Sequence, residues 1–477
     1  MAARAPEACC YHRGVRKLLV FLVFVLIAAG LVWFLAGRAA GPEIALESPS
    51  AVIGQRSALK LAAYAPGASL TQLDVSLEQS GRTLPLGTLE APGKLAFAPA
   101  ADHVAVTGVV GRESSPDLRQ GDATLVVTAS RPVLFGMRHV TSTLRKDLQV
   151  RLTPPTVTVL SQFHFINQGG AELVVYQVNP ADVESGVRVG ELEYPGVAAA
   201  GAGIPDAPPG LRVAFFPFLF DQPPSTRVSV WARDPAGNQT LASFDHRVTP
   251  EQFRKSTIPL GDAFLAKVVP AILGQTPDLE VSDPGNLLES YLTINRDLRQ
   301  HNADMIRTIG RTKSAKEILW RGPFRQMVNS AVEAGFADDR TYVYQGKPVD
   351  RQVHLGFDLA STQNAPIHAA NSGVVVFAGY LGIYGNCVIV DHGMGLQSLY
   401  AHLSSISVQE GQSVELNGEL GRSGQTGLAG GDHLHFTMLL HGEAVTPVDW
   451  WSSQWIEDRV MRKLRAAGAP ATVAAAQ

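Results

Sequence analysis

The segment His354-Leu-Gly-Phe-Asp358 opens a histidine-rich region around which the rest of the chain can be interpreted. The region passes Tyr400-Ala-His402-Leu403 and closes on Gly431-Asp-His433-Leu-His435-Phe436. Seven of the 13 histidines of the chain lie in the 88 residues from His354 to His441. Imidazole is the commonest protein ligand for borderline metals, and it also moves protons near neutral pH. This crowding, together with one well-placed aspartate, predicts a hydrolytic metal site.

Length and composition indicate a multidomain globular protein. The 477 residues are too many for one core, and typical domain sizes predict roughly two to four domains. With 45% hydrophobic and 17% charged residues, the chain is too apolar for disorder. The net charge of -3 offers no basic face, so nucleic acid is not an expected partner.

The three cysteines give no structural framework. Cys9 and Cys10 precede an apolar segment, and Cys387 stands alone after it. The portion after the apolar segment therefore forms no internal disulfide, and the chain has no CxxC motif to hold a metal. Cys387 lies in an apolar run and is expected in the core.

An apolar segment near the N-terminus predicts the compartment. Leu18 to Gly37 is a run of twenty residues without a charge, and as a helix it would cover ~30 Å, the thickness of a bilayer core. Basic residues lie among residues 13–17, and only Arg38 follows closely. The positive-inside bias then predicts a cytoplasmic tail over residues 1–17, a transmembrane anchor over 18–37 and an external bulk.

The expected location is a single-pass protein of the cell inner membrane, with its C-terminal bulk in the periplasm. A cleaved signal peptide is the alternative, although its apolar part would be about 7–15 residues long, and no clean cleavage site precedes Gly41. Both interpretations place the bulk of the protein beyond a membrane.

The following 200 residues are rich in short β-strand patterns. Short alternating or β-branched runs, separated by Gly, Pro, Asn and Asp, are typical of β-sandwiches. Two immunoglobulin-like units are predicted, over residues 43–150 and 151–248. The segment Val228-Ser-Val-Trp-Ala-Arg-Asp-Pro-Ala-Gly-Asn238 resembles the penultimate strand and turn of bacterial immunoglobulin-like domains.

A helical linker and lead-in is predicted over residues 249–344. Thr249 and Pro250 are typical of a helix start, and a pattern close to 3.6 residues runs from Asn286 to Ile309. The linker is expected to pack on or position the next domain. A regulatory or partner-binding arm is the alternative.

The histidine-rich region itself predicts a compact antiparallel β-sheet. Glycines interrupt its extended runs, and no helical period is present between Ser372 and Thr437. In a strand, His433 and His435 point to the same face, so both can face one cleft. A catalytic zinc needs three protein ligands and one open position. The candidate ligands are His354, Asp358 and one or more of His402, His433 and His435.

Six ordered motifs make this region similar to the lysostaphin/LytM-type zinc metallopeptidases. They are His354-x-Gly-x-Asp358, Tyr384-Gly-Asn386, Asp391-His-Gly393, Tyr400-Ala-His402-Leu-Ser404, Gly421-Arg-Ser-Gly-Gln-Thr-Gly427 and His433-Leu-His435-Phe436. The resemblance covers residues 345–451, the expected zinc metallopeptidase domain. It implies a small antiparallel β core in a chain that is mainly β overall. It also implies Zn2+ ligands at His354, Asp358 and His435, and catalytic histidines at His402 and His433.

The resemblance also implies the reaction, which is hydrolysis of peptide cross-links or stem peptides in bacterial peptidoglycan by a zinc-activated water. One of His402 and His433 would move the proton, and the other would stabilise the oxyanion; the residues leave this assignment open. Asp391 or Asp432 would orient an imidazole, or would simply close a strand or turn.

Two other functions fit the same residues. One is a non-catalytic scaffold that activates cell-wall amidases, which a covered cleft would favour. The other is a zinc peptidase that acts on protein substrates. Expected partners are peptidoglycan, the inner membrane and cell-wall or divisome proteins. Residues 452–477 are expected to form a short helix and a frayed tail. His392 is expected in a turn, and His368 and His441 at the surface or rim.

Overall fold

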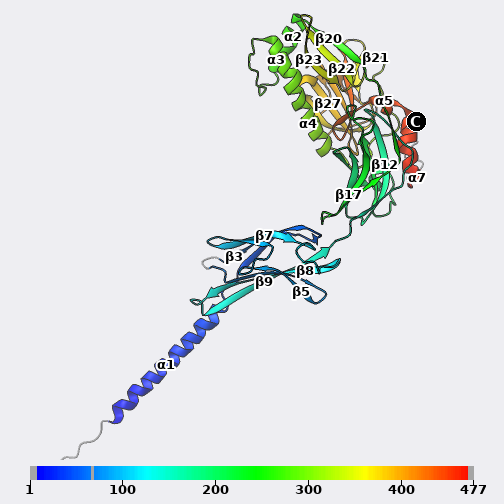
Figure 1. Cartoon of the computed structure of the whole chain (residues 1–477). Helices are drawn as coiled ribbons and strands as arrows, with labels where there is room; N and C mark the ends of the chain where they lie inside the picture. Colours follow the sequence, from blue (N-terminus) through cyan, green and yellow to red (C-terminus); the bar gives the residue numbers. More distant parts are fainter. Residues whose placement is uncertain (1–7, 66–68, 471–477) are drawn as a thin grey trace, which may run out of the picture. The chain divides into compact units, whose positions relative to one another are not determined.

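The computed structural model describes residues 8–65 and 69–470, and the protein is mainly β (Figure 1). Its chain divides into two compact units. One unit holds residues 1–154 together with 233–239, and the other holds residues 155–232 and 240–477. Residues 1–7 of the predicted cytoplasmic tail and residues 471–477 of the predicted frayed end lie outside the described residues.

The N-terminal apolar segment is helical, as predicted. Helix α1 (Ala8–Ala36) contains a stretch from Val15 to Ala36 with a mean hydropathy of 3.0, and none of it is buried in the protein. By length and composition this stretch could cross a membrane, and a signal sequence would have the same properties.

The first unit contains a β-sandwich with alternating burial. A four-stranded sheet in the order β1-β3-β7-β6 faces a five-stranded sheet in the order β2-β9-β8-β4-β5, and their inner faces share one core. The strands are β1 (Glu43–Ser48), β2 (Val52–Ile53), β3 (Ser57–Tyr64), β4 (Gln72–Gln79), β5 (Arg82–Thr88), β6 (Leu95–Pro99), β7 (His103–Val110), β8 (Gly121–Val133) and β9 (Arg138–Val150).

A second sandwich pairs the sheets β10-β12-β16-β15 and β14-β13-β17-β18, and strands β11 and β19 form a separate parallel pair. Its elements are β10 (Thr156–Val159), β11 (His164–Asn167), β12 (Ala171–Asn179), β13 (Glu184–Val189), β14 (Leu192–Pro195), β15 (Val197–Ala198), η1 (Ala199–Ala202), β16 (Leu211–Pro217), β17 (Val228–Arg233), β18 (Gln239–Ser243) and β19 (His246–Thr249). The Asp-Pro-Ala-Gly-Asn turn lies between β17 and β18, as predicted. The immunoglobulin-like assignment of both sandwiches stays a prediction.

Strand β12 packs on both of its faces. Val174 and Tyr176 face the core of their own sandwich, whereas Leu173 and Val175 belong to a core shared with the C-terminal sheet. The alternation of the strand therefore divides its side chains between two cores. The second sandwich and the C-terminal sheet are packed together by this shared core.

The segment between the second sandwich and the histidine-rich region is partly helical. Its elements are β20 (Lys255–Leu260), α2 (Asp262–Leu273), α3 (Leu287–Thr293), η2 (Ile294–Leu298) and α4 (Arg299–Thr312). The helical prediction for residues 286–309 is confirmed, and the Asn286 side chain caps α3 by accepting a hydrogen bond from the backbone N–H of Glu289. The predicted helix start at Thr249 is wrong, because Thr249 ends a strand that pairs with Asn167.

The C-terminal region contains the predicted antiparallel sheet, in the order β21-β24-β32-β28-β27-β26-β30 with β33 paired to β32. Two three-stranded sheets, β20-β22-β23 and β25-β31-β29, accompany it. The strands are β21 (Ala331–Ala334), β22 (Asp338–Tyr344), β23 (Lys347–His354), β24 (Phe357–Ala360), β25 (Pro366–His368), β26 (Gly373–Tyr380), β27 (Asn386–Gly393), β28 (Leu396–Leu403), β29 (Ser405–Ile406), β30 (Ser413–Val414), β31 (Glu419–Arg422), β32 (Leu434–Leu440) and β33 (Glu443–Val445). The short helix η3 (Gly382–Tyr384) precedes β27.

Both faces of this sheet are covered. On one face, Ile306 and Ile309 of α4 pack against a cluster that includes Cys387 and Leu399, and α4 runs along the yellow and orange strands in Figure 1. The shared core with β12 covers the other face. Cys387 is buried as predicted, and burial raises the pKa of its thiol.

C-terminal helices close the shared core. They are α5 (Pro447–Trp451), α6 (Ser453–Ile456), η4 (Glu457–Met461) and α7 (Arg462–Ala466). The Nζ atom of Lys463 donates to Oε1 of Glu172 on β12 at 2.6 Å and to the carbonyl of Leu173 at 3.0 Å. Burial raises the pKa of Glu172 and lowers the pKa of Lys463.

We expect Lys463→Met to destabilise the protein by about 3–5 kcal/mol, because the carboxylate of Glu172 would stay buried without its cation. The Glu172→Met/Lys463→Met double variant should recover most of this loss, since an apolar pair removes both desolvation costs. Urea unfolding followed by tryptophan fluorescence measures both changes. Additive losses in the double variant would contradict this account.

A second prediction concerns Asp449 on α5, whose Oδ1 accepts a hydrogen bond from Nδ2 of Asn167 at 3.1 Å. Burial raises the pKa of Asp449 to about 7, against about 3.9 in an unfolded chain. Between about pH 4 and pH 7 the folded state then binds more protons, so this group lowers stability as pH rises.

Asp449→Asn should therefore gain stability relative to the wild type as pH rises through this window, by up to about 1.4 kcal/mol per pH unit. Unfolding free energies of the two proteins at pH 5, 6 and 7 measure the difference. Parallel pH profiles would show that Asp449 ionises normally in the folded chain.

Candidate metal centre

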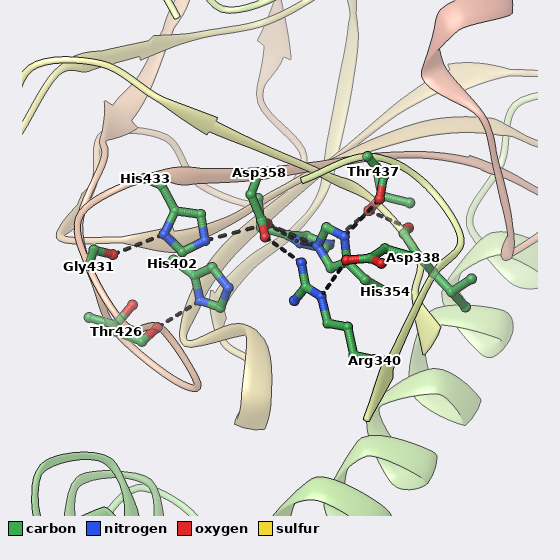
Figure 2. A network of polar contacts seen from close by, with 12 residues as sticks. Asp338, Arg340, His354, Asp358, His402, Thr426, Gly431, His433 and Thr437 are labelled. Atoms are coloured by element: carbon green, nitrogen blue, oxygen red, sulfur yellow. Dashed lines mark hydrogen bonds and ion pairs between the residues drawn. The ribbon is translucent and has the colours of Figure 1, made fainter. Parts of the chain in front are cut away.

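The C-terminal sheet brings residues from distant parts of the sequence to one point. Asp358 on β24 lies directly opposite His435 on β32, and His435 is also paired with Ala401 on β28, next to His402. His354 ends β23. The registers place Asp358 and His435 side by side, His354 reaches them from the neighbouring sheet β20-β22-β23, and His402 departs from the strand conformation with a φ of +62° (Figure 2).

Three potential ligand atoms converge closely. Nε2 of His354 lies 2.9 Å from Oδ1 of Asp358 and 2.9 Å from Nδ1 of His435. The Nδ1 atom of His435 lies 3.2 Å from the same carboxylate oxygen. His354, Asp358 and His435 form the one group among the described residues that could hold a metal ion through one atom each.

Hydrogen bonds on the outer side of each imidazole determine which nitrogen faces the group. Nδ1 of His354 lies 3.1 Å from the carbonyl oxygen of Gly335, so that nitrogen carries the proton. Nε2 of His435 lies 3.0 Å from Oγ1 of Thr437, whose hydroxyl donates to the carbonyl of Leu355 at 3.0 Å. The Nε2 atom of His435 must therefore donate to Thr437.

With these tautomers, two nitrogen lone pairs and a carboxylate oxygen face one another at 2.9–3.2 Å without a proton between them. Such an arrangement favours a bound cation. Two imidazoles and one carboxylate are a donor set that suits zinc and leaves a further position open. The residues present therefore fit a zinc ion.

The second oxygen of Asp358 is held by Arg340 on β22. The Nη2 atom of Arg340 donates to Oδ2 of Asp358 at 2.9 Å, and its Nε atom donates to Oδ2 of Asp338 at 3.2 Å. Ser256 on β20 donates to the other oxygen of Asp338. Burial opposes ionisation of Asp358, but His354, His433 and His435 hold its pKa well below the usual range.

Two further histidines border the group, and Asp358 lies between His433 and His354 in Figure 2. The Nδ1 atom of His433 lies 2.9 Å from the carbonyl of Gly431, and its Nε2 atom lies 3.5 Å from Oδ1 of Asp358. The Nδ1 atom of His402 lies 2.8 Å from the carbonyl of Thr426. Both Nδ1 atoms therefore act as donors. The Nε2 atom of His402 then carries a lone pair, whereas the Nε2 atom of His433 faces the carboxylate of Asp358, to which it donates when the ring is protonated.

The surroundings shift the pKa values of the two imidazoles in opposite directions. Burial lowers the pKa of His402 well below its usual range, and His433 and His435 lower it further. Burial also opposes protonation of His433, but the carboxylate of Asp358 outweighs it and raises the pKa of His433. The imidazole rings of His402 and His433 are 4.9 Å apart between centroids.

A pocket of about 380 Å³ adjoins the five residues. Apolar and aromatic side chains from the segment before the C-terminal sheet also line it, including Leu260, Phe264 and Tyr291. Tyr384 lines the pocket too and packs edge-on against His435 at 5.5 Å between ring centroids. The cleft thus has a polar wall of histidines and an apolar wall supplied by β20, α2 and α3.

The two aspartates that were predicted as possible partners of an imidazole, Asp391 and Asp432, make other contacts. The carboxylate of Asp391 accepts a hydrogen bond from the N–H of Ala315 at 2.9 Å, and Asp432 accepts one from the N–H of Asn364 at 3.0 Å. These contacts favour the strand-end and turn interpretation. The residues that contact the candidate ligands, Arg340 and Thr437, were not predicted. Only Thr437 had a sequence signal, because it lies two residues after His435 on the same strand face.

The remaining histidines are structural or exposed. The prediction that His441 lies at the surface or rim is wrong: it is buried, its Nε2 atom donates to the carbonyl of Phe215 at 3.0 Å, and its ring stacks on Tyr194. The prediction that His392 lies in a turn is wrong: it is buried in β27, where Nδ1 donates to the carbonyl of Ser372 at 2.7 Å. His368 is exposed, as predicted.

Residues 352–447 match peptidase family M23. The DD-carboxypeptidase/endopeptidase Mpg of Neisseria meningitidis serogroup B is 41% identical over 97 residues, which are 20% of this chain and 22% of that protein. The peptidoglycan DD-endopeptidase ShyA of Vibrio cholerae is 37% identical over 100 residues, 20% of this chain and 23% of that protein. The chain thus spans less than a quarter of the length of these curated relatives.

Among solved structures, the catalytic domain of lysostaphin from Staphylococcus simulans is 27% identical, with a TM-score of 0.22. The similarity covers 26% of this chain and 92% of that domain. The resemblance that the sequence motifs indicated is confirmed: residues 352–447 of this chain are a peptidase M23 domain.

Proposed function

We propose that this chain is a membrane-anchored zinc metalloendopeptidase that hydrolyses peptide cross-links or stem peptides of bacterial peptidoglycan. The observation that carries the proposal is the convergence of three potential ligand atoms beside a pocket in an M23 domain. The DD-endopeptidase names of two relatives support peptidoglycan as the substrate class.

In this proposal His354, Asp358 and His435 hold zinc. When bound, zinc supplies a Lewis acid that polarises a peptide carbonyl and lowers the pKa of water. Gly335 and Thr437 keep the ligating nitrogens of the two histidines free of protons. Arg340 occupies Oδ2 of Asp358 and leaves Oδ1 directed at the metal position.

His402 and His433 move the proton and stabilise developing charge. Each imidazole keeps its Nδ1–H on a backbone carbonyl, so Nε2 is the atom that takes up or releases a proton, and on His433 this atom lies beside the carboxylate of Asp358. The carbonyls of Thr426 and Gly431 fix the ring orientations during this transfer. The apolar wall of the pocket reduces the access of bulk water to the reacting groups.

The proposed substrate also suggests where the protein is located in the cell. Peptidoglycan lies outside the inner membrane, and the apolar helix with basic residues before it supports an anchor with a cytoplasmic N-terminus and a periplasmic bulk. The two sandwiches, over residues 43–150 and 151–248, then act as spacers between the membrane and the wall. Residues 249–344 serve as the linker, and cell-wall or divisome proteins are the expected protein partners.

One observation favours a second candidate, a non-catalytic activator of amidases. Residues of β20, α2 and α3 line the same pocket as the metal group and so cover part of the cleft. The pocket nevertheless retains about 380 Å³ beside the two Nε2 atoms, which favours the hydrolase. Cleavage of cross-linked muropeptides by the purified protein distinguishes the two.

We expect His435→Ala to lose both zinc and activity, because it removes one of three ligands. His433→Ala should retain about one zinc per chain and lose muropeptide cleavage, because it removes a proton carrier and no ligand. Zinc content by atomic absorption and product release by chromatography are measured on the same samples, with the exposed His368→Ala as the matched control. Loss of zinc in His433→Ala would reassign that residue as a ligand.

Thr437→Val removes the acceptor for Nε2–H of His435 while keeping the shape of the side chain. We expect zinc affinity to fall by about 10–100-fold, because the ligating tautomer is no longer held. Competition with a fluorescent chelator measures the affinity. Thr437→Ser keeps the hydroxyl and should bind zinc like the wild type; equal affinities in all three proteins would exclude the orienting role.

A further inference from the structure

The hairpin between β8 and β9 ends in an exposed apolar loop. Val133 pairs with Arg138, and the four residues between them are Leu134-Phe135-Gly136-Met137. The Phe135 side chain is fully exposed and Met137 is 65% exposed. Large apolar side chains at a hairpin tip are unusual in water, where polar turn residues are preferred.

The backbone of the loop is also unusual. Leu134 and Phe135 both have a φ of +53°, and the N–H of Gly136 donates to the carbonyl of Val133 at 3.2 Å. Asn and Gly normally fill such positions, because a left-handed conformation is unfavourable for bulky residues. The chain thus keeps two bulky residues in a strained turn whose tip lacks core contacts. Strain of this kind is typical of binding sites.

The loop lies beside the C-terminal end of α1. Nη1 of Arg138 donates to the carbonyl of Trp33 at 2.7 Å, and its guanidinium lies 5.4 Å from the centre of the Trp33 ring. Nε of Arg131 donates to the carbonyl of Ala40 at 2.9 Å. Trp33 lies within the apolar part of α1, three residues before its end at Ala36. The loop is therefore next to residues that a membrane anchor would place at the bilayer interface.

We propose that Leu134–Met137 inserts into the outer leaflet of the membrane beside the anchor. Phe135 and Met137 would lie at the boundary of head groups and acyl chains, and Arg131 and Arg138 would face the lipid phosphates. This inference rests on the anchor in the proposed function. It gives the first sandwich a second attachment to the membrane, which would fix the sandwich on the bilayer surface.

Lipid is the occupant that the surroundings favour. Only residues 37–42 separate α1 from β1, so the sandwich cannot move far from the membrane that holds the anchor. Two arginines flank the apolar tip, and this combination suits an anionic interface better than the apolar patch of a protein partner. A second copy of the chain or another protein is an outcome that the experiment must separate.

The test uses nitroxide spin labels on the full-length chain in liposomes of phosphatidylethanolamine and phosphatidylglycerol. Cys9 and Cys10 are replaced by serine, and the buried Cys387 is retained. Labels are placed singly at Phe135→Cys and, as a second site, at Met137→Cys. Collisions with oxygen report lipid, and collisions with a water-soluble nickel complex report water.

Two control labels make the result specific. Ser80→Cys lies in the exposed β4–β5 turn, where the neighbouring Gln79 hydrogen-bonds to the carbonyl of Asp122 at the other end of β8. Its label should stay in water. Val25→Cys lies inside α1 and reports on the anchor itself.

We expect the labels at Phe135 and Met137 to be shielded from nickel and accessible to oxygen, as at Val25. Water accessibility at Phe135 and Met137 with lipid accessibility at Val25 would overturn the insertion and leave the anchor intact. Water accessibility at Val25 would refute the anchor and the insertion together. Spin–spin broadening at Phe135 that grows with the protein-to-lipid ratio would identify a second copy as the occupant and overturn the lipid assignment.

Discussion

The pairing of β24 with β32 is the constraint on which the candidate site depends. It sets Asp358 opposite His435, and directly opposite residues of an antiparallel pair have neighbouring side chains. A slip of one residue would turn one candidate ligand to the other face of the sheet, and the three potential ligand atoms would no longer converge. Strand β32 is buried along its whole length, and a slip would turn the polar His435 and Thr437 into the apolar core that holds Leu434 and Phe436, which resists it.

Segments outside the M23 domain (residues 352–447) help to bury strand β32. Helix α4 covers one face of the sheet, and β12 with the C-terminal helices covers the other. The second sandwich thus contributes to the core that holds the ligand-bearing strands, beyond its proposed role as a spacer. The buried pair of Glu172 and Lys463 joins these parts across a region where an unpaired charge would be costly.

Features with local causes could be predicted from the sequence. The apolar N-terminal helix, the β-rich character, the helix after Asn286 and the shared face of His433 and His435 all follow from periodicity. The ligand and catalytic roles came from the family resemblance and stay proposals. Packing between segments that are distant in the sequence could not be predicted. His441 carries no local sign of its burial, and β20 pairs in parallel with β22, more than 70 residues later in the chain.

Strand β20 has a further consequence for the site, because it is linked to Asp358 through Asp338 and Arg340 and also contributes to the pocket wall. Ser256 donates to Asp338, Asp338 accepts from Arg340, and Arg340 holds the second oxygen of Asp358. The same strand supplies Leu260 to the apolar wall. A displacement of β20 that widened the cleft would therefore also loosen the support of a ligand. The pocket wall and the support of a candidate ligand thus share one strand, and we expect access to the cleft and the geometry of the candidate site to change together.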